Sequence, residues 1–226
     1  MGRCIRPQAV KEDKVFSGDE IRNNYDKFIE ETSPFYIDGY PWNKMFDIAL
    51  IRENNIRFPR FRRLQDSAFL IRYLDYVNKV MFMSESIYIY YENSLKTIWD
   101  KYPVDFINYV IGLNNEWQKI ALRWNENNTR LKAILQGRYV SRIITSMELV
   151  FSPKAKLSND KEKKKKMLEY IEESGINNFA DTYINSRYQR MVLKLVTKGK
   201  TDEAYNLIKF KTFLDKHNLL HFFVKG

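Results

Sequence analysis

The chain has 226 residues, of which 44% are hydrophobic and 15% aromatic, and it carries a net charge of +10. This length and apolar content allow one domain or two small ones with a buried core, and they exclude a disordered chain as the default. The charge alone does not choose among nucleic acid, an acidic membrane surface and phosphate-bearing substrates, because all three attract a basic protein.

Cysteine and histidine are scarce, with Cys4 as the single cysteine and His217 and His221 as the only histidines. The sequence therefore predicts no intramolecular disulfide and no Cys/His metal cluster, as expected for a protein of the reducing cytoplasm. No apolar run approaches the roughly 20 residues of a membrane-spanning helix, and the first residues lack the apolar core of a signal peptide.

In the first 16 residues, the apolar residues do not recur at the spacing of a helix or a strand. Ser17 and Glu20 are then spaced as a capping box, in which the serine accepts from a backbone amide and the glutamate reaches back. A helix over about residues 19–31 is predicted, with an apolar face formed by Ile21, Tyr25, Phe28 and Ile29.

A turn is predicted at residues 38–41, so Trp42 should lie at the start of the next element. Apolar residues at positions 45, 46, 49 and 50 predict a short helix ending near Glu53. The segment 56–58 should be extended, because it precedes Pro59 and a residue before proline is pushed out of the helical region.

Asp66 stands where the next helix should begin. The apolar stripe of that helix consists of Phe69, Leu70, Tyr73, Leu74 and Val77. An aspartate at such a position is typical of a helix cap that accepts from free amides, so Asp66 taken alone is interpreted as a cap. Residues 79–83 and 87–91 are β-branched and aromatic, and two short strands are predicted there.

The remainder of the chain has a helical pattern. The predicted helices cover about residues 105–113, 115–124, 128–151, 158–175, 186–198 and 201–217. Within them, the run from Lys161 to Lys166 is interpreted as a solvated helix face. The fold class expected is α/β turning mainly α, with one region over 1–100, a helical C-terminal region over 101–226, and a weaker hinge near residue 155.

Two clusters carry candidate chemistry. Trp42 beside Lys44 suits a stacking plate next to an anion-binding amine, although a core tryptophan and a surface lysine have the same pattern. Arginines at positions 57, 60, 62 and 63 suit a phosphate-contacting loop, because each offers a planar fork to phosphate oxygens. A solvated basic loop is the alternative for that segment.

Together these elements resemble the second half of the catalytic domain of family 2 glycosyltransferases, in particular the bacterial capsule and exopolysaccharide transferases. That family carries a Trp-x-Lys-x-Phe element, an extended Arg-Phe segment, a Glu-Asp pair that opens a helix containing Phe, and a Tyr-x-Tyr strand. The resemblance covers about residues 15–99 and rests on Trp42-Asn43-Lys44-Met45-Phe46, Ile56-Arg57-Phe58, Gln65-Asp66 with Phe69, and Tyr88-Ile89-Tyr90.

The resemblance implies a partial GT-A-like fold and inverting transfer of a sugar from a nucleotide-sugar donor to a glycan or lipid-linked acceptor. It implies that Asp66 is the general base and that Trp42 lines the sugar site. Lys44 with Arg62 or Arg63 would compensate the diphosphate leaving group. Gln65 takes the place of the glutamate that the family usually has.

The family's N-terminal nucleotide-binding half has no counterpart here, and Asp-x-Asp occurs nowhere in the sequence. We therefore expect a truncated transferase that is weakly active or inactive alone. A partner chain would supply the donor half, and Mg²⁺ or Mn²⁺ is expected only with that half. Such a protein would work in the cytoplasm, including the inner face of the membrane, where it could associate peripherally.

A hypothesis from a different class is a non-catalytic basic helical module that binds nucleic acid or an acidic membrane surface. It predicts affinity that falls steeply with salt and does not depend on Trp42 or Asp66. Acidic residues dilute the basic ones along most helices, and no nucleic-acid-binding motif is recognisable, so nucleic acid is the less favoured partner. A third hypothesis is that the chain is an inactive gene remnant that folds only partly.

Overall fold

The computed structural model describes residues 3–5, 10–37, 39–85, 90–92 and 98–217. Helices dominate the described residues, as the sequence predicted. The chain divides into two compact units, unit 1 with residues 1–96 and 112–135 and unit 2 with residues 97–111 and 136–226. Residues 112–135 thus group with the N-terminal part, whereas the boundary near residue 100 stays a prediction.

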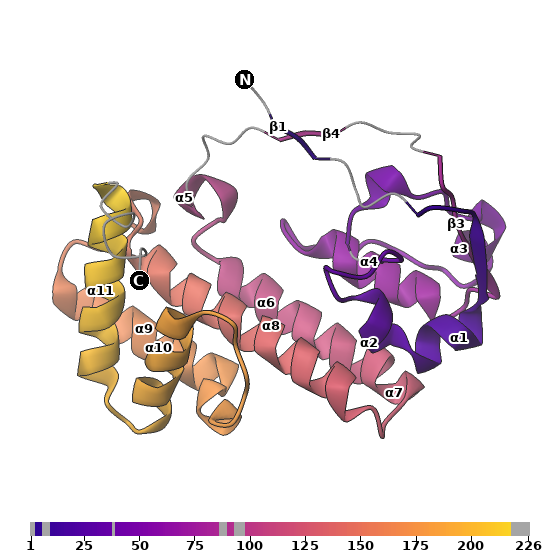
Figure 1. Ribbon diagram of the computed structural model, residues 1–226. Helices are drawn as coiled ribbons and strands as arrows, with labels where there is room; N and C mark the ends of the chain where they lie inside the picture. Colours follow the sequence, from indigo (N-terminus) through magenta and orange to yellow (C-terminus); the bar gives the residue numbers. More distant parts are fainter. Residues whose placement is uncertain (1–2, 6–9, 38, 86–89, 93–97, 218–226) are drawn as a thin grey trace. The chain divides into compact units, whose positions relative to one another are not determined.

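Unit 1 combines short helices with two antiparallel strand pairs (Figure 1). Its elements are β1 (Arg3–Ile5), β2 (Lys14–Ser17), α1 (Gly18–Asn23), α2 (Tyr25–Phe28), η1 (Pro41–Asn43), α3 (Ile48–Glu53), α4 (Gln65–Leu74), β3 (Lys79–Phe82), β4 (Tyr90–Glu92), the π-helical turn η2 (Trp117–Ala121) and α7 (Leu122–Trp124). Two further helices, α6 (Phe106–Glu116) and α8 (Thr129–Glu148), contain the boundaries between the units.

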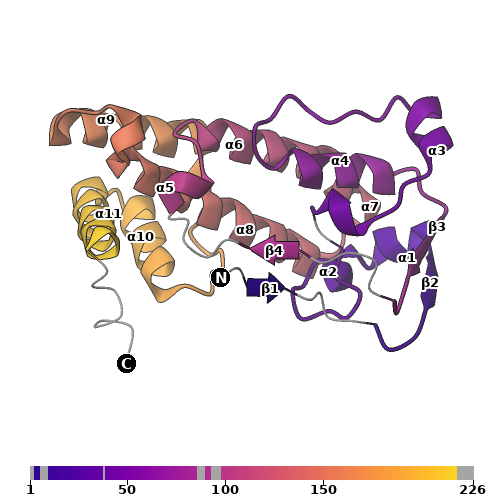
Figure 2. The same ribbon diagram turned by 90° about the horizontal axis from the view of Figure 1, so that it is seen from above.

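The regular elements among the described residues of unit 2 are all helices or helical turns. It contains α5 (Ile98–Lys101), the 3₁₀ turns η3 (Leu149–Phe151), η4 (Pro153–Ala155) and η5 (Ile176–Phe179), and the helices α9 (Asp160–Ser174), α10 (Arg187–Thr197) and α11 (Thr201–Lys216). Helices α10 and α11 lie side by side (Figure 2). The core of this unit includes Phe106, Ile143, Ile144, Met147, Ile171, Ile176, Val192, Tyr205 and Ile208.

The capping box at Ser17 forms as predicted. The Ser17 hydroxyl accepts from the Glu20 amide at 3.1 Å, and the Glu20 carboxylate accepts from the Ser17 amide at 2.7 Å. The helix that follows is interrupted at Asn24, which divides it into α1 and α2. Its expected apolar face is buried all the same, since Ile21, Tyr25, Phe28 and Ile29 are at most 5% exposed.

Helix α4 forms the centre of unit 1. The predicted stripe is confirmed, because all five of its residues are buried. Burial extends to Ser67, Ala68 and Ile71 on the remaining faces, so the helix is enclosed on most sides. A helix buried this completely can hold a side chain in its first turn in a fixed position.

The strand predicted over residues 79–83 is confirmed as β3, whereas β1 and β2 were not predicted from the sequence. β3 pairs with β2, placing Val15 opposite Met81, and β4 pairs with β1. Residues 1–16, which show no clear period, therefore supply two strands. Each strand has only three or four residues, too few for the alternation of a strand to stand out. Positions 86–89, including Tyr88 of the Tyr-x-Tyr element, lie outside the described residues.

The helix boundaries show three further differences from the sequence-based expectations. The predicted break between residues 113 and 115 is wrong, because α6, η2 and α7 are continuous and bury Leu113 and Trp117. Helix α9 is capped by Asn159 rather than Ser158. Thr201 begins α11 but makes no capping bond there. The predicted stop at Gly175 is confirmed, where φ is +60° and glycine is the favoured residue.

Candidate functional site

The candidate site is the turn of residues 39–44 together with the first turn of α4, all within unit 1. A Cβ atom placed on Gly39 would lie 2.7 Å from the Ser67 Oγ, so the chain at Gly39 packs directly against α4. At the other end of the turn, the charge of Lys44 acts on the carboxylate of Asp66. The structure thus brings together two segments that are more than 20 residues apart in the sequence.

Lys44 is held by its own turn. Its Nζ donates to the carbonyl of Tyr40 at 2.7 Å and to the Oδ1 of Asn43 at 2.8 Å. Its backbone amide also donates to the carbonyl of Pro41, which closes the 3₁₀ turn η1. These bonds fix the position of the ammonium group, and both acceptors are neutral.

Asp66 lies half-buried in the first turn of α4. Burial raises the pKa of its carboxyl group, and the positive charge of Lys44 lowers it in part. No described residue donates a hydrogen bond to this carboxylate, and the N-cap position belongs to Leu64. The interpretation of Asp66 as a capping residue is therefore wrong, because the helix begins one residue earlier and places Asp66 inside it.

The backbone just before Asp66 has an unusual conformation. Leu64 adopts φ +66° and ψ 3°, a left-handed conformation that bulky residues seldom adopt. Gln65 follows, and its Oε1 is buried without a hydrogen-bond partner among the described residues. Strained backbone and unsatisfied polar groups are costly, and they concentrate at functional sites, where the surrounding structure maintains them.

Aromatic packing holds the turn and α4 together. The Phe46 ring makes edge contacts with Phe69 at 5.3 Å and with Tyr73 at 5.0 Å, measured between ring centroids. The Tyr73 hydroxyl accepts from the backbone amide of Asp47 at 3.0 Å. The Phe46 ring, two residues after Lys44, therefore anchors the turn to α4.

The loop before α4 is anchored from the other side. Phe58 stacks on Phe69 with centroids 4.1 Å apart, and Arg72 donates to the carbonyl of Arg57 at 2.9 Å. Arg72 also forms a two-pronged bond to Glu116, with distances of 2.9 and 2.6 Å. A guanidinium in such a fork is firmly oriented, so the loop that leads to Asp66 has fixed ends.

Trp42 is half-buried in η1, and its ring lies 5.4 Å from that of Tyr40 at an angle of 34°. Tyr40 is 55% exposed, so part of this aromatic pair is accessible to solvent. Such a surface suits stacking against the C–H face of a sugar ring.

Arg62 and Arg63 are both exposed in the loop before α4. Neither makes an ion pair or a hydrogen bond with a described residue. The structure therefore places these two guanidinium groups near the start of α4 in sequence but does not bring them into contact with Asp66 or Lys44. Their role in binding a leaving group stays a prediction.

A cavity of about 360 Å³ adjoins this site, and Lys44 forms part of its wall. The rest of the wall is largely apolar and includes Tyr36, Ile37, Phe46, Tyr73, Val80, Met81 and Phe82. Sequence reasoning missed this cavity, because Tyr73 and residues 79–83 carry only the signal of a buried stripe and a strand. Neither Trp42 nor Asp66 lines it.

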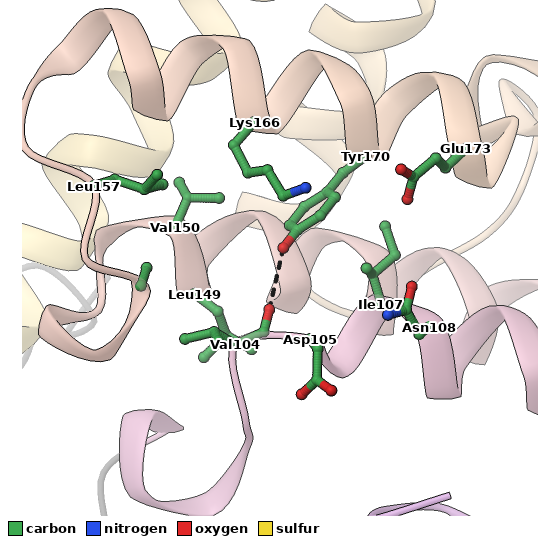
Figure 3. Close-up of a pocket in the computed structure, with 11 residues that line it drawn as sticks. Val104, Asp105, Ile107, Asn108, Leu149, Val150, Leu157, Lys166, Tyr170 and Glu173 are labelled. Carbon is green, nitrogen blue, oxygen red and sulfur yellow. Dashed lines mark hydrogen bonds between the residues drawn. The ribbon is translucent and has the colours of Figure 1, made fainter.

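Unit 2 has a separate cavity of about 320 Å³. Figure 3 shows Tyr170 at its centre, with the hydroxyl donating to the carbonyl of Val104 at 3.1 Å. Apolar side chains such as Leu149 and Val150 form one side, and Asn108 and Glu173 lie toward the other. The site residues predicted from the sequence all lie elsewhere, in unit 1.

Among the described residues, no three histidine, cysteine, aspartate or glutamate side chains are grouped to hold a metal ion. In the same part of the chain, none of the helices is both long enough and apolar enough to cross a bilayer. Comparisons with family models, curated proteins and solved structures gave no match.

The close approach of Gly39 to α4 leads to a first prediction. Gly39→Ala should lower the free energy of unfolding by about 1–3 kcal/mol, because the new methyl group meets the buried Ser67 hydroxyl and forces the turn away from α4. Chemical denaturation measures this change. The double variant Gly39→Ala/Ser67→Ala should be no less stable than Ser67→Ala alone. An unchanged stability of Gly39→Ala would show that the turn does not pack against α4.

Proposed function

We propose that unit 1 forms the acceptor side of a GT-A-like glycosyltransferase of the family 2 type. The observation that carries the proposal is the state of Asp66. It is a half-buried carboxylate with a raised pKa and no hydrogen-bond donor among the described residues, and Lys44 acts on it from a turn that also carries Trp42. A carboxylate that caps no helix and has no structural bond is available to accept a proton.

The proposed reaction is inverting sugar transfer. The Asp66 carboxylate accepts the proton of an acceptor hydroxyl while that oxygen forms a bond to the anomeric carbon of the donor sugar. The bond from this carbon to the nucleoside diphosphate breaks, and the diphosphate leaves with the bonding electrons. A raised pKa suits this role, because a base with a pKa nearer to the working pH accepts a proton more readily.

The remaining site residues would orient substrates rather than react. The open face of the Tyr40–Trp42 pair would stack on the acceptor sugar, and Lys44 would keep Asp66 ionised as well as attract phosphate. Gln65 has a buried amide oxygen without a hydrogen-bond partner among the described residues, and we assign it a positioning role beside Asp66. Arg62 and Arg63, exposed in the preceding loop, would meet the negative charge of the leaving diphosphate.

The donor side must come from other residues. The sequence has no Asp-x-Asp, the element that holds the divalent metal on the diphosphate in this family. Neutralising the leaving group supplies much of the catalysis in such reactions, so the described residues alone would transfer sugar weakly or not at all. We propose that a partner supplies the nucleotide-sugar site together with Mg²⁺ or Mn²⁺, for surface polysaccharide synthesis at the inner face of the membrane.

Sugar turnover tests this proposal. The full chain is mixed with the separately expressed N-terminal half of a family 2 transferase, radiolabelled nucleotide sugars, Mn²⁺ and a panel of oligosaccharide and short-chain lipid-linked acceptors. We expect transfer only when both protein parts are present, and a product of inverted anomeric configuration. Transfer that is independent of the chain, or absent with every donor half that binds to it, would contradict the proposal.

A non-catalytic basic module is the second candidate, and one observation in unit 2 favours it for that part of the chain. Residues 186–200 contain five basic residues and no acidic one. Binding to an anionic surface through this segment does not exclude sugar transfer in unit 1.

A further inference from the structure

Helix α10 and the residues flanking it concentrate positive charge. Between Ser186 and Lys200 the basic residues are Arg187, Arg190, Lys194, Lys198 and Lys200, without a single aspartate or glutamate. In α9 of the same unit, the lysine run of residues 161–166 includes one glutamate, and two of its lysines form ion pairs. Lys164 pairs with Asp202 at 2.9 Å and Lys166 with Glu169 at 2.8 Å.

We call one set of exposed residues the α10 stripe: Arg187, Met191 and Lys194 on α10, and Lys198, which directly follows the last helical residue, Thr197. Their spacing of four, three and four residues places them on one side of the helix, and all four are exposed. The three cations make no ion pair with a described residue. The opposite face, with Val192, Leu193 and Val196, is buried in unit 2.

Tyr183 extends the surface beyond the start of the helix. Its ring is 72% exposed, and the Arg190 guanidinium lies 5.9 Å from the ring centroid. Arg190 also donates to the carbonyls of Ile184 and Asn185, so it holds the segment that carries Tyr183 against the helix. Arg190 is therefore used inside the protein, whereas the three cations of the stripe point to solvent.

The charge at the start of α10 opposes the helix dipole. Arg187 is the first helical residue, and the first turn contains no acidic residue. The first turns of α1, α9 and α11 each contain two acidic residues, whereas those of α3, α6 and α8 contain none. Positive charge at a helix N-terminus is unfavourable, so Arg187 is not explained by helix stability.

We propose that the α10 stripe, with Tyr183, docks unit 2 on the surface of an anionic lipid bilayer. Basic side chains near such a surface are attracted by its negative potential, and tyrosine partitions to the headgroup level. An exposed Met191 between the cations favours a bilayer over nucleic acid, because an apolar side chain gains from contact with the acyl boundary and little from a phosphate backbone. The docking would hold the chain where lipid-linked acceptors reside.

Vesicle sedimentation with the full chain tests this inference. Vesicles of phosphatidylcholine alone are compared with vesicles containing one-third phosphatidylglycerol, at 50 and 300 mM salt. Binding should require the anionic lipid and should weaken with salt. The triple variant Arg187→Gln/Lys194→Gln/Lys198→Gln should lose roughly a hundredfold in partition coefficient, at about fivefold per charge. Met191→Ser should lose a smaller factor.

The matched control removes three exposed lysines from other helix faces of the same unit, Lys161→Gln/Lys165→Gln/Lys216→Gln. It should keep most of the binding, because the net charge changes equally but the stripe remains. The single variant Arg187→Gln should bind more weakly without a lower unfolding temperature. Equal losses in both triple variants would overturn the proposal in favour of general charge attraction. Tighter binding to RNA or DNA than to the vesicles would overturn it in favour of nucleic acid.

This experiment is independent of the proposed sugar transfer. Asp66→Asn should leave vesicle binding unchanged, and the stripe variants should leave transfer to a water-soluble oligosaccharide unchanged. A failure of the docking proposal therefore leaves the site in unit 1 untouched, and the reverse also holds.

Discussion

Asp66→Asn should reduce sugar transfer, measured with a donor half supplied, by at least roughly a hundredfold. General bases contribute factors of about 10²–10⁴, and an amide of the same shape cannot accept the proton. The unfolding temperature should not fall, since the carboxylate caps no helix and accepts no hydrogen bond from a described residue. Ser17→Ala is the control for the stability measurement. It removes an oxygen that does cap a helix, so it should lower the free energy of unfolding by about 1 kcal/mol, unlike Asp66→Asn.

The pH dependence of transfer follows from the same residue. Asp66 acts as a base only when ionised, so transfer should fall as the pH drops through its pKa. Burial raises that pKa, so the fall should begin at higher pH than for an ordinary aspartate, whose pKa is 3.8. Lys44→Met removes the charge that lowers the pKa and should shift the acid limb to still higher pH. If Lys44→Met left the acid limb of the pH profile unmoved, the charge of Lys44 would not act on Asp66, and this part of the account would be wrong.

Lys211→Met should destabilise unit 2 by about 3–5 kcal/mol, the largest stability change that we expect. Lys211 donates to Glu148 at 2.8 Å and pairs with Asp215 at 2.7 Å. Glu148 is 3% exposed, so removing its partner leaves a buried carboxylate without a countercharge. Urea denaturation at pH 7.5 measures the loss. The double variant Lys211→Met/Glu148→Gln should recover most of it.

The loss of unfolding free energy in Lys211→Met, here called the deficit, should be larger at high pH than at low pH. Burial already raises the pKa of Glu148 above its usual 4.5, and the charge of Lys211 opposes that shift. Without Lys211 the folded-state pKa rises further above the unfolded value. The stability linked to a raised pKa is complete below the unfolded pKa and is lost as the pH rises through the folded one. The deficit should therefore shrink from pH 7.5 toward pH 4.5, and a constant deficit would contradict this account.

Local signals in the sequence predicted much of the fold. The apolar stripe of α4, the capping box at Ser17 and the glycine that ends α9 each depend on neighbours within a few residues, and the structure confirms all three. The pairing of β2 with β3 joins residues more than 60 positions apart, and four-residue strands carry too little pattern to reveal it. The break predicted near residue 114 was wrong because burial of Leu113 and Trp117 outweighs the weak helix preference of asparagine.

The candidate site was predicted in part. The order of Trp42, Lys44 and Asp66 pointed to a shared site, and the structure places the turn beside α4 and the charge of Lys44 near Asp66. The capping role expected of Asp66 failed because Leu64 adopts a left-handed conformation that starts the helix earlier. The Arg72–Glu116 pair, which fixes the loop leading to Asp66, links residues 44 positions apart and has no signature in the sequence.

The central claim is that the turn carrying Trp42 and the start of α4 bind an acceptor sugar, and ¹⁹F NMR tests it on the chain alone. The full chain is labelled with 5-fluorotryptophan, which gives one signal for each of its four tryptophans, and Trp42→Phe identifies the signal of Trp42. Titration with acceptor oligosaccharides should move that signal saturably while the signals of the buried Trp117 and of Trp124 stay in place. Gly39→Ala should weaken the response. A Trp42 signal that stays unmoved by every saccharide, or moves no more than that of Trp124, would contradict the account.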